Sequence, residues 1–138
     1  MRGVDDLGVV SFDTFREKRG VLVPVELAKS VPFPVKRIFW IFDVPVGGMR
    51  ADHAHKICQQ FMICAAGALR LETFDGERER TLALEAGQGL HVPALMFVTA
   101  WFERPGSVLM VLCDQSYDPG DYIFDRAALT MFRRAVRR

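Results

Sequence analysis

The chain has 138 residues, which is enough for one ordinary domain and too few for two. Half of the residues are hydrophobic and a quarter are charged, which excludes an intrinsically disordered protein. The formal net charge of +1 argues against a nucleic-acid partner. No run approaches the roughly 20 apolar residues that span a bilayer, so we expect no membrane partner either.

The three cysteines, Cys58, Cys64 and Cys113, cannot all pair with one another. None lies in a Cys-x-x-Cys pair, so neither a disulfide scaffold nor a zinc knuckle is indicated. Cys64 and Cys113 lie within apolar runs, where a free cysteine is usually a small buried hydrophobe. The N-terminus lacks the apolar stretch of a signal peptide, so we expect a reduced, cytoplasmic protein.

Most of the chain is expected to form short β-strands separated by turns. The expected strands are residues 21–26, 37–44, 51–56, 59–65, 68–73, 81–84, 89–92, 97–102 and 107–113. Asp75-Gly76 lies between two of these runs and predicts a hairpin. Strands spaced by about ten residues, with turn residues between them, favour an all-β sandwich or barrel over an α/β fold.

The C-terminal segment, about residues 125–137, is the one convincing helix. Leu129, Phe132 and Val136 recur at spacings of three and four, which predicts one apolar stripe. The last turn is basic, with Arg133, Arg134, Arg137 and Arg138. We expect these arginines to be solvated and to match the negative end of the helix dipole rather than to bind phosphate.

Two of the three histidines, His53 and His55, lie two residues apart in an expected strand. Residues i and i+2 of a strand point to the same face, so the two imidazoles project together. A bare His-x-His is more often two hydrogen-bonded histidines on a polar face than an active site. The residues around this pair favour the active site.

The spacing around the pair resembles the first motif of the cupin superfamily. That motif reads Gly, five residues, His-x-His, three or four residues, Glu, six residues, Gly. Here Gly47, Gln60 and Gly67 stand at the Gly, Glu and Gly positions. The resemblance implies an all-β cupin fold, a double-stranded β-helix or jelly-roll barrel, followed by the short C-terminal helix. We expect a single cupin domain over residues 1–138, with its core at about residues 9–124.

Metal-dependent cupins hold a divalent ion with three histidines and one glutamate. Here Gln60 replaces the glutamate and Val98 replaces the third histidine, and two imidazoles are too few for a stable site. The resemblance therefore implies a cupin with no metal and no other cofactor, whose histidines act as acid and base. A metal-dependent cupin enzyme that uses His53, His55 and His91 as ligands is an alternative.

Over about residues 9–126 the chain resembles a metal-free branch of the cupins, the sugar 3,4-ketoisomerases that act on thymidine-diphosphate-4-keto-6-deoxyglucose. Family members read approximately Arg-Gly-x-His-Ala-His-Lys, which residues 50–56 match with Ala51 in place of the glycine. They close with Tyr-Asp-x-x-Asp-Tyr-Ile, which residues 117–123 match. The chain departs from them at Met96-Phe97, where members often have Trp-His, and at Phe39, where they often have Tyr. A non-catalytic or altered-specificity sugar-nucleotide-binding cupin is therefore a second alternative.

The resemblance implies an isomerase that moves a keto group from C4 to C3 of the sugar through an enediol. It implies His55 as the base that removes the C3 proton, and His53 as the partner that moves protons between the oxygens. The residues implied to contact the nucleotide sugar are Arg37, Arg50, Gln60, Phe39 and Trp101. The resemblance also implies a homodimer with exchanged N-terminal strands, and eleven Phe and six Met residues agree with a large apolar surface.

Each of these contacts has a structural alternative. Arg50 suits a diphosphate or a developing oxyanion, but it also suits a salt bridge with Asp52. Gln60 suits a sugar hydroxyl, or a hydrogen bond to a neighbouring strand. Three aromatic residues are candidates for stacking on thymine or sugar, namely Phe39, Trp40 and Trp101. The alternative is that they belong to the core.

Overall fold

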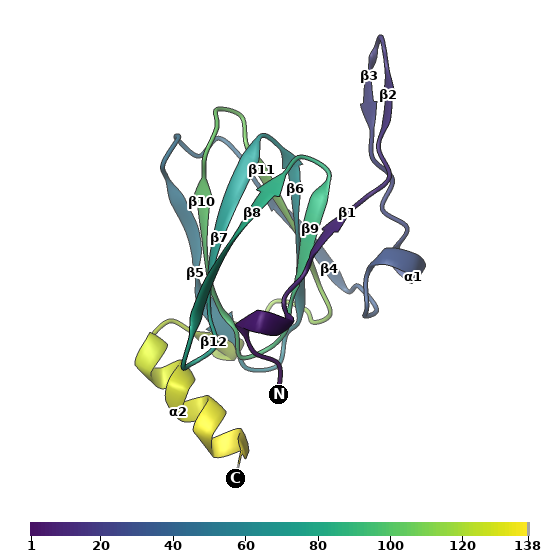
Figure 1. Cartoon of the computed structure of the whole chain (residues 1–138). Coiled ribbons are helices and arrows are strands. Elements are labelled where there is room, and N and C mark those ends of the chain that lie inside the picture. The colour runs from purple at the N-terminus through teal and green to yellow at the C-terminus, as the bar shows by residue number, and fades with distance from the viewer. Residues whose placement is uncertain (138) are drawn as a thin grey trace.

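The computed structural model describes residues 1–137, and two antiparallel β-sheets make up most of it (Figure 1). The first sheet has the strand order β1-β9-β6-β11-β4 and the second has the order β12-β5-β10-β7-β8. The strands are β1 (Val9–Ser11), β4 (Arg37–Ile41), β5 (Met49–His55), β6 (Gln60–Ala66), β7 (Ala68–Phe74), β8 (Glu79–Glu85), β9 (Gln88–Val92), β10 (Phe97–Phe102), β11 (Val108–Cys113) and β12 (Tyr122–Ile123). The helices are η1 (Val4–Asp6), α1 (Leu27–Ser30), η2 (Pro119–Asp121) and α2 (Arg126–Arg137).

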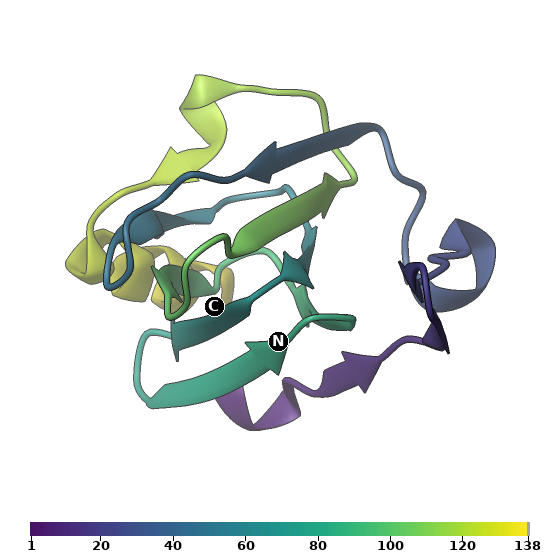
Figure 2. The ribbon, with the colours of Figure 1, turned by 90° about the horizontal axis from the view of Figure 1, so that it is seen from above.

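The two sheets face each other and enclose a common interior (Figure 2). Apolar side chains alternate along the strands and fill this interior. In β8, for example, Leu82 and Leu84 are buried in the core, whereas Thr81 and Ala83 are exposed. This arrangement confirms the predicted all-β cupin fold, a jelly-roll barrel with a short C-terminal helix.

The hairpin predicted at Asp75-Gly76 is confirmed, because β7 and β8 pair along their whole length across this turn. The buried Asp75 carboxylate accepts hydrogen bonds from the backbone N–H groups of Val4, Glu77 and Arg78. One side chain therefore closes the turn and ties the N-terminal segment to it.

The C-terminal helix α2 packs against the second sheet through only one residue of its predicted stripe. Leu129 is fully buried, whereas Phe132 and Val136 are exposed. The prediction of a solvated basic turn is wrong for Arg133, which is buried and donates to the backbone oxygens of Leu95 and Arg2. Arg138 lies outside the described residues. Within residues 1–137, no helix is long and apolar enough to cross a bilayer.

The N-terminal strands β2 (Phe15–Glu17) and β3 (Gly20–Leu22) form a hairpin that stands away from the barrel (Figure 1). The prediction of a single strand over residues 21–26 is wrong, because pairing ends at Leu22 and Pro24 follows. The hairpin exposes Phe15, Val21 and Leu22 by more than half of their surface. It therefore adds little to the core of its own chain.

Candidate active site

A cavity of about 280 Å³ lies between the two sheets, and His53 is on its wall. The lining residues are Phe39, Ile41, Arg50, Ala51, His53, Gln60, Met62, Leu109, Val111 and Tyr122. The structure thus brings together four of the seven predicted site residues, namely Phe39, Arg50, His53 and Gln60. An apolar cavity with a few convergent polar groups is the usual form of a small-molecule site.

A bulge in β5 directs His53 into the cavity. Ala51 and Asp52 have φ angles of 71° and 66°, in the left-handed region that L-residues rarely adopt. The pairing of β5 with β10 shifts at this point, from Val98 opposite His53 to Thr99 opposite Ala51. A bulge of this kind bends a strand and re-aims the next side chains. The Asp52 carboxylate stabilises the bulge by accepting a hydrogen bond of 3.0 Å from Thr99 Oγ1.

His53 presents an uncharged imidazole to the cavity. Its Nδ1 lies 3.0 Å from the carbonyl oxygen of Ala51. A carbonyl only accepts, so Nδ1 carries the proton and Nε2 keeps its lone pair. Burial, together with the neighbouring His55, lowers the pKa of His53 to about 4. His53 is therefore a proton acceptor at neutral pH.

His55 lies next to His53 but is not among the residues that line the cavity, although the period of the strand predicts that the two imidazoles project together. The two rings meet edge to face, with centroids 4.9 Å apart. His55 is 5% exposed, and its Nδ1 lies 3.0 Å from Asp121 Oδ2. A carboxylate only accepts, so Nδ1 donates and Nε2 keeps a lone pair that is buried without a partner. Burial lowers the pKa of His55, and Asp121 opposes this effect.

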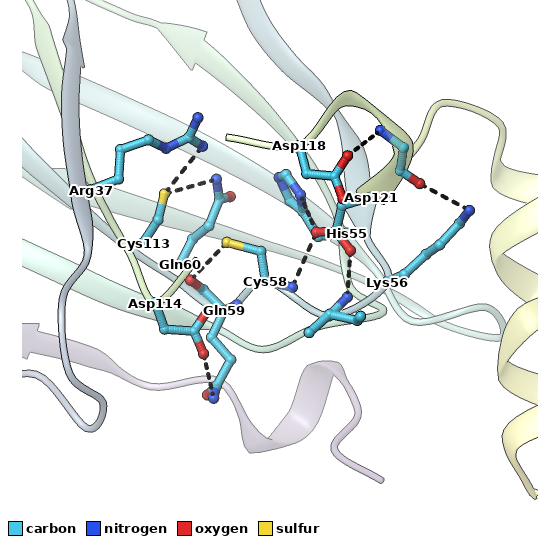
Figure 3. A network of polar contacts seen from close by, with 12 residues as sticks. Arg37, His55, Lys56, Cys58, Gln59, Gln60, Cys113, Asp114, Asp118 and Asp121 are labelled. Atoms are coloured by element: carbon cyan, nitrogen blue, oxygen red, sulfur yellow. Dashed lines mark hydrogen bonds and ion pairs between the residues drawn. The ribbon is translucent and has the colours of Figure 1, made fainter. Parts of the chain in front are cut away.

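The backbone of the β5–β6 loop fixes Asp121 (Figure 3). Oδ1 accepts from the N–H of Ile57 at 2.8 Å, and Oδ2 accepts from the N–H of Cys58 at 3.1 Å. Asp121 lies in the Tyr-Asp-x-x-Asp-Tyr-Ile motif, which by itself predicts no role for this carboxylate. Its contact with His55 spans 66 residues, so local spacing does not reveal it.

Arg37, Cys113 and Gln60 form one cross-strand row on the inner face of the first sheet. Cys113 Sγ accepts from Arg37 Nη2 at 3.6 Å and from Gln60 Nε2 at 3.7 Å (Figure 3). Gln60 lines the cavity and its amide also contacts the neighbouring strand, as the structural alternative predicts; its contact with a sugar hydroxyl stays a prediction. Arg37 is not on the wall, but its guanidinium carbon lies 5.1 Å from the ring centroid of Phe39, and Phe39 is part of the wall.

Arg50 lies exposed at the rim of the cavity. The alternative of a salt bridge with Asp52 is not observed, and no ion pair within residues 1–137 involves Arg50. A guanidinium without a carboxylate partner suits phosphate, to which it donates in a bidentate manner.

Trp101 and Trp40 lie on the outer faces of the sheets, and the structure does not bring Trp101 to the cavity as predicted. Ala100 and Phe102 are the fully buried inward residues of this part of β10, so the residue between them faces outward. The Trp101 ring lies 5.2 Å from the guanidinium carbon of Arg70. Trp40 is 59% exposed on β4.

His91 lies on the outer face of the first sheet, opposite Phe61 of β6. Its Nε2 is 2.9 Å from Gln59 Oε1, and its ring packs against Phe33. The three histidines therefore do not converge. Val98 is buried at the position of the missing ligand, so these donors do not fit the metal site of metal-dependent cupins.

The model of one protein family, described as FdtA, WxcM-like, C-terminal, matches residues 5–134. The chain belongs to this family. It is also 34% identical over 116 residues to a curated WxcM-like relative, the TDP-4-oxo-6-deoxy-alpha-D-glucose-3,4-oxoisomerase of Aneurinibacillus thermoaerophilus. The match covers 83% of this chain and 84% of the relative.

Solved structures agree with the WxcM-like assignment. A 3,4-ketoisomerase from Helicobacter canadensis has a TM-score of 0.83 and 29% identity, and the match covers 93% of this chain and 98% of that chain. QdtA, a sugar 3,4-ketoisomerase from Thermoanaerobacterium thermosaccharolyticum in complex with TDP, has a TM-score of 0.87 and 26% identity, and the match covers 96% of this chain and 98% of QdtA. The resemblance to sugar 3,4-ketoisomerases that the sequence predicts is confirmed.

Proposed function

We propose that this WxcM-like protein is a sugar 3,4-ketoisomerase, which moves the keto group of a TDP-4-keto-6-deoxyhexose from C4 to C3. The observation that carries the proposal is the neutral His53 on the cavity wall, backed by the His55–Asp121 pair. Its relatives named as 3,4-ketoisomerases support the same reaction.

In this proposal His53 removes the C3 proton, because it is the histidine that reaches the cavity. This reverses the two roles implied by the resemblance. The electrons of the C3–H bond form a C3=C4 double bond, and the C4 carbonyl oxygen takes up a proton to give an enediol. Loss of the O3 proton then creates the C3 ketone, and C4 takes back a proton from His53. The chemistry needs only groups that gain and lose protons near neutral pH.

His55 moves the proton between O3 and O4. Asp121 holds Nδ1–H, so Nε2 is the atom that accepts and returns a proton. The buried carboxylate also stabilises the imidazolium that forms for part of the cycle. His55 is not on the cavity wall, so the bound sugar has to place O3 and O4 within reach of its Nε2.

The cavity size suggests how the nucleotide sugar lies. About 280 Å³ is at the lower end of small-molecule sites, so it accommodates a hexose ring and leaves the nucleotide at the rim. Arg50 is at this rim and pairs with the diphosphate. Phe39 and Gln60 contact the sugar from the wall, with the apolar ring against carbon atoms and the amide against a hydroxyl. Arg37 does not reach the sugar directly and acts through the ring of Phe39, against which it packs.

The alternative of a non-catalytic binding module gains no support from Met96-Phe97. Both side chains are at most 2% exposed, and they belong to core clusters outside the cavity lining. Incubation of the purified protein with TDP-4-keto-6-deoxyglucose, followed by NMR, tests the proposal. We expect a 3-keto sugar, whose C4 configuration the same spectrum gives. Tight TDP binding with unchanged substrate contradicts it.

We also propose a homodimer in which the β2–β3 hairpins are exchanged. The hairpin stands away from the barrel and exposes Phe15 and Leu22 by 59% and 60%. The outer face of β4 exposes Trp40, and also Ile38 by 48%. Large apolar surfaces of this kind mark association sites. Light scattering is expected to give the mass of two chains, and a monomeric mass at micromolar concentration contradicts the exchange.

A further inference from the structure

Two of the three cysteines meet behind the cavity wall, and the proposed chemistry uses neither. Cys113 is on β11 opposite Gln60, and Cys58 lies in the loop between β5 and β6. The carbonyl oxygen of Gln59 accepts from Cys58 Sγ at 3.3 Å and from the N–H of Asp114 at 3.2 Å, which places Cys58 beside the residue that follows Cys113. Both are free and buried, and Figure 3 shows them within one polar network.

The surroundings of Cys113 favour a thiolate. Its sulfur accepts from a guanidinium nitrogen of Arg37 at 3.6 Å and from the Gln60 amide at 3.7 Å. The neighbouring Cys58 thiol, together with the hydrogen bonds from Arg37 and Gln60, lowers the pKa of Cys113 to about 6, although burial acts in the opposite direction. The neighbouring Cys113 raises the pKa of Cys58, and the guanidinium of Arg37 donates to Cys113, so Cys113 is the thiol of the pair that ionises. A thiolate next to a cationic group is the reactive form of cysteine.

Cys64 provides an internal comparison within the same barrel. It is also fully buried, but within residues 1–137 its sulfur has one hydrogen-bond partner, the backbone oxygen of Ala66. Burial raises the pKa of Cys64 to about 11. Cys64 and Cys113 are both buried in the same barrel, so the neighbours of Cys113, and not its burial, account for its lowered pKa.

We propose that Cys58 and Cys113 form a redox-active dithiol site whose substrate is a hydroperoxide. The Cys113 thiolate attacks one peroxide oxygen, the O–O bond breaks, and hydroxide leaves and is protonated to water. The sulfenic acid formed on Cys113 is then attacked by Cys58, which loses its proton. The S–S bond forms, the S–O bond breaks and a second water leaves. Two thiols thus give two electrons to one hydrogen peroxide.

Hydrogen peroxide reaches this site through the active-site cavity. Gln60 is part of the cavity wall and also contacts the Cys113 sulfur, so one side chain separates the two. Entry of peroxide, a molecule scarcely larger than water, therefore requires this amide to change rotamer.

Oxidation acts on the catalytic histidines through the backbone of Cys58. Its N–H donates to the same Asp121 oxygen that binds His55, at 3.1 Å and 3.0 Å respectively. A disulfide has an S–S distance of about 2 Å, so the loop must move Cys58 toward Cys113. This movement withdraws a hydrogen bond from Asp121 and loosens its hold on His55. The predicted loss of turnover rests on the proposed function, whereas the disulfide does not.

Peptide mass analysis of the full chain tests the dithiol site. Reduced protein is exposed to hydrogen peroxide at pH 7, and the remaining thiols are alkylated. We expect a Cys58–Cys113 disulfide and a loss of Cys113 thiol about tenfold or more faster than that of Cys64. Cys58→Ser is expected to leave a sulfenic acid on Cys113 that dimedone traps, and the matched control Cys64→Ser to form the disulfide as before. Equal reaction of all three thiols in the wild-type chain overturns the proposal.

Turnover measured on the same samples separates the two proposals. Oxidised protein is expected to lose about tenfold or more of its ketoisomerase turnover and to recover with dithiothreitol, because general acid–base catalysis contributes at least that much. A disulfide without any change in turnover overturns the coupling to Asp121. A chain that forms the disulfide but is inactive when reduced refutes the ketoisomerase and leaves the dithiol site standing.

Discussion

Replacement of Asp121 by asparagine tests whether a carboxylate has to orient His55. The carboxylate accepts three hydrogen bonds, from His55 Nδ1 and from the N–H groups of Ile57 and Cys58. An asparagine amide has only one accepting atom, so at least one partner loses its acceptor. If the amide nitrogen faces His55, Nδ1 must accept, and the proton moves to Nε2, where it blocks the proposed relay.

The expected loss of kcat for Asp121→Asn is about 10²-fold or more, the scale of one general acid–base group. Leaving one buried N–H unpaired lowers the free energy of unfolding by about 1–3 kcal/mol. Steady-state kinetics and urea denaturation measure the two effects separately. Asp118→Asn is the matched control, because its exposed side chain accepts only from Gly120 N–H and is expected to leave kcat unchanged. A folded Asp121→Asn protein with full kcat refutes the role given to Asp121.

Three further predictions concern pH and stability. The pKa of His53 is lowered to about 4, and the base must be uncharged to accept a proton. We therefore expect kcat/KM to stay constant as the pH falls to 6 and to decline only at lower pH. A decline centred at pH 6.5 or above contradicts a buried base. Ala51→Gly should raise the free energy of unfolding by about 1 kcal/mol, because glycine relieves the φ of 71°, and urea denaturation that shows a loss instead contradicts a strained bulge. Asp75→Ala should lower the free energy of unfolding by about 1–3 kcal/mol, because the buried Val4 N–H loses its acceptor. Asp13→Ala, at an exposed position, is the control and should change this free energy little.

Much of the barrel could be predicted from local pattern. The strand at residues 97–102 was predicted with its observed bounds, and the other main strands within a few residues, because β-branched and aromatic runs end at clear turn residues. The phase of a strand is harder to predict when both faces are apolar. In β10, Phe97 and Trp101 face outward while Val98 and Phe102 face the core, and no polar alternation distinguishes the two sets.

The candidate site was predicted where one motif contained it and missed where distant segments meet. His53 and Gln60 were found through their spacing, and the period of the strand placed both histidines on one face. That period does not tell how deep each imidazole lies, which depends on the bulge at Ala51 and on Asp121. The nearness of Cys58 to Cys113 was missed for the same reason, because a loop and a strand far along the chain come together there.

The most direct test of the account is the exchange of sugar hydrogens with heavy water, followed by NMR. The wild-type protein and TDP-4-keto-6-deoxyglucose in deuterium oxide should give a 3-keto product with deuterium at C4, and recovered substrate with deuterium at C3. His53→Asn should lose both signals by about 10²-fold or more while its affinity for TDP changes little, because the rim holds the nucleotide. A folded His53→Asn protein that still exchanges the C3 hydrogen at the wild-type rate contradicts the central claim that His53 is the base.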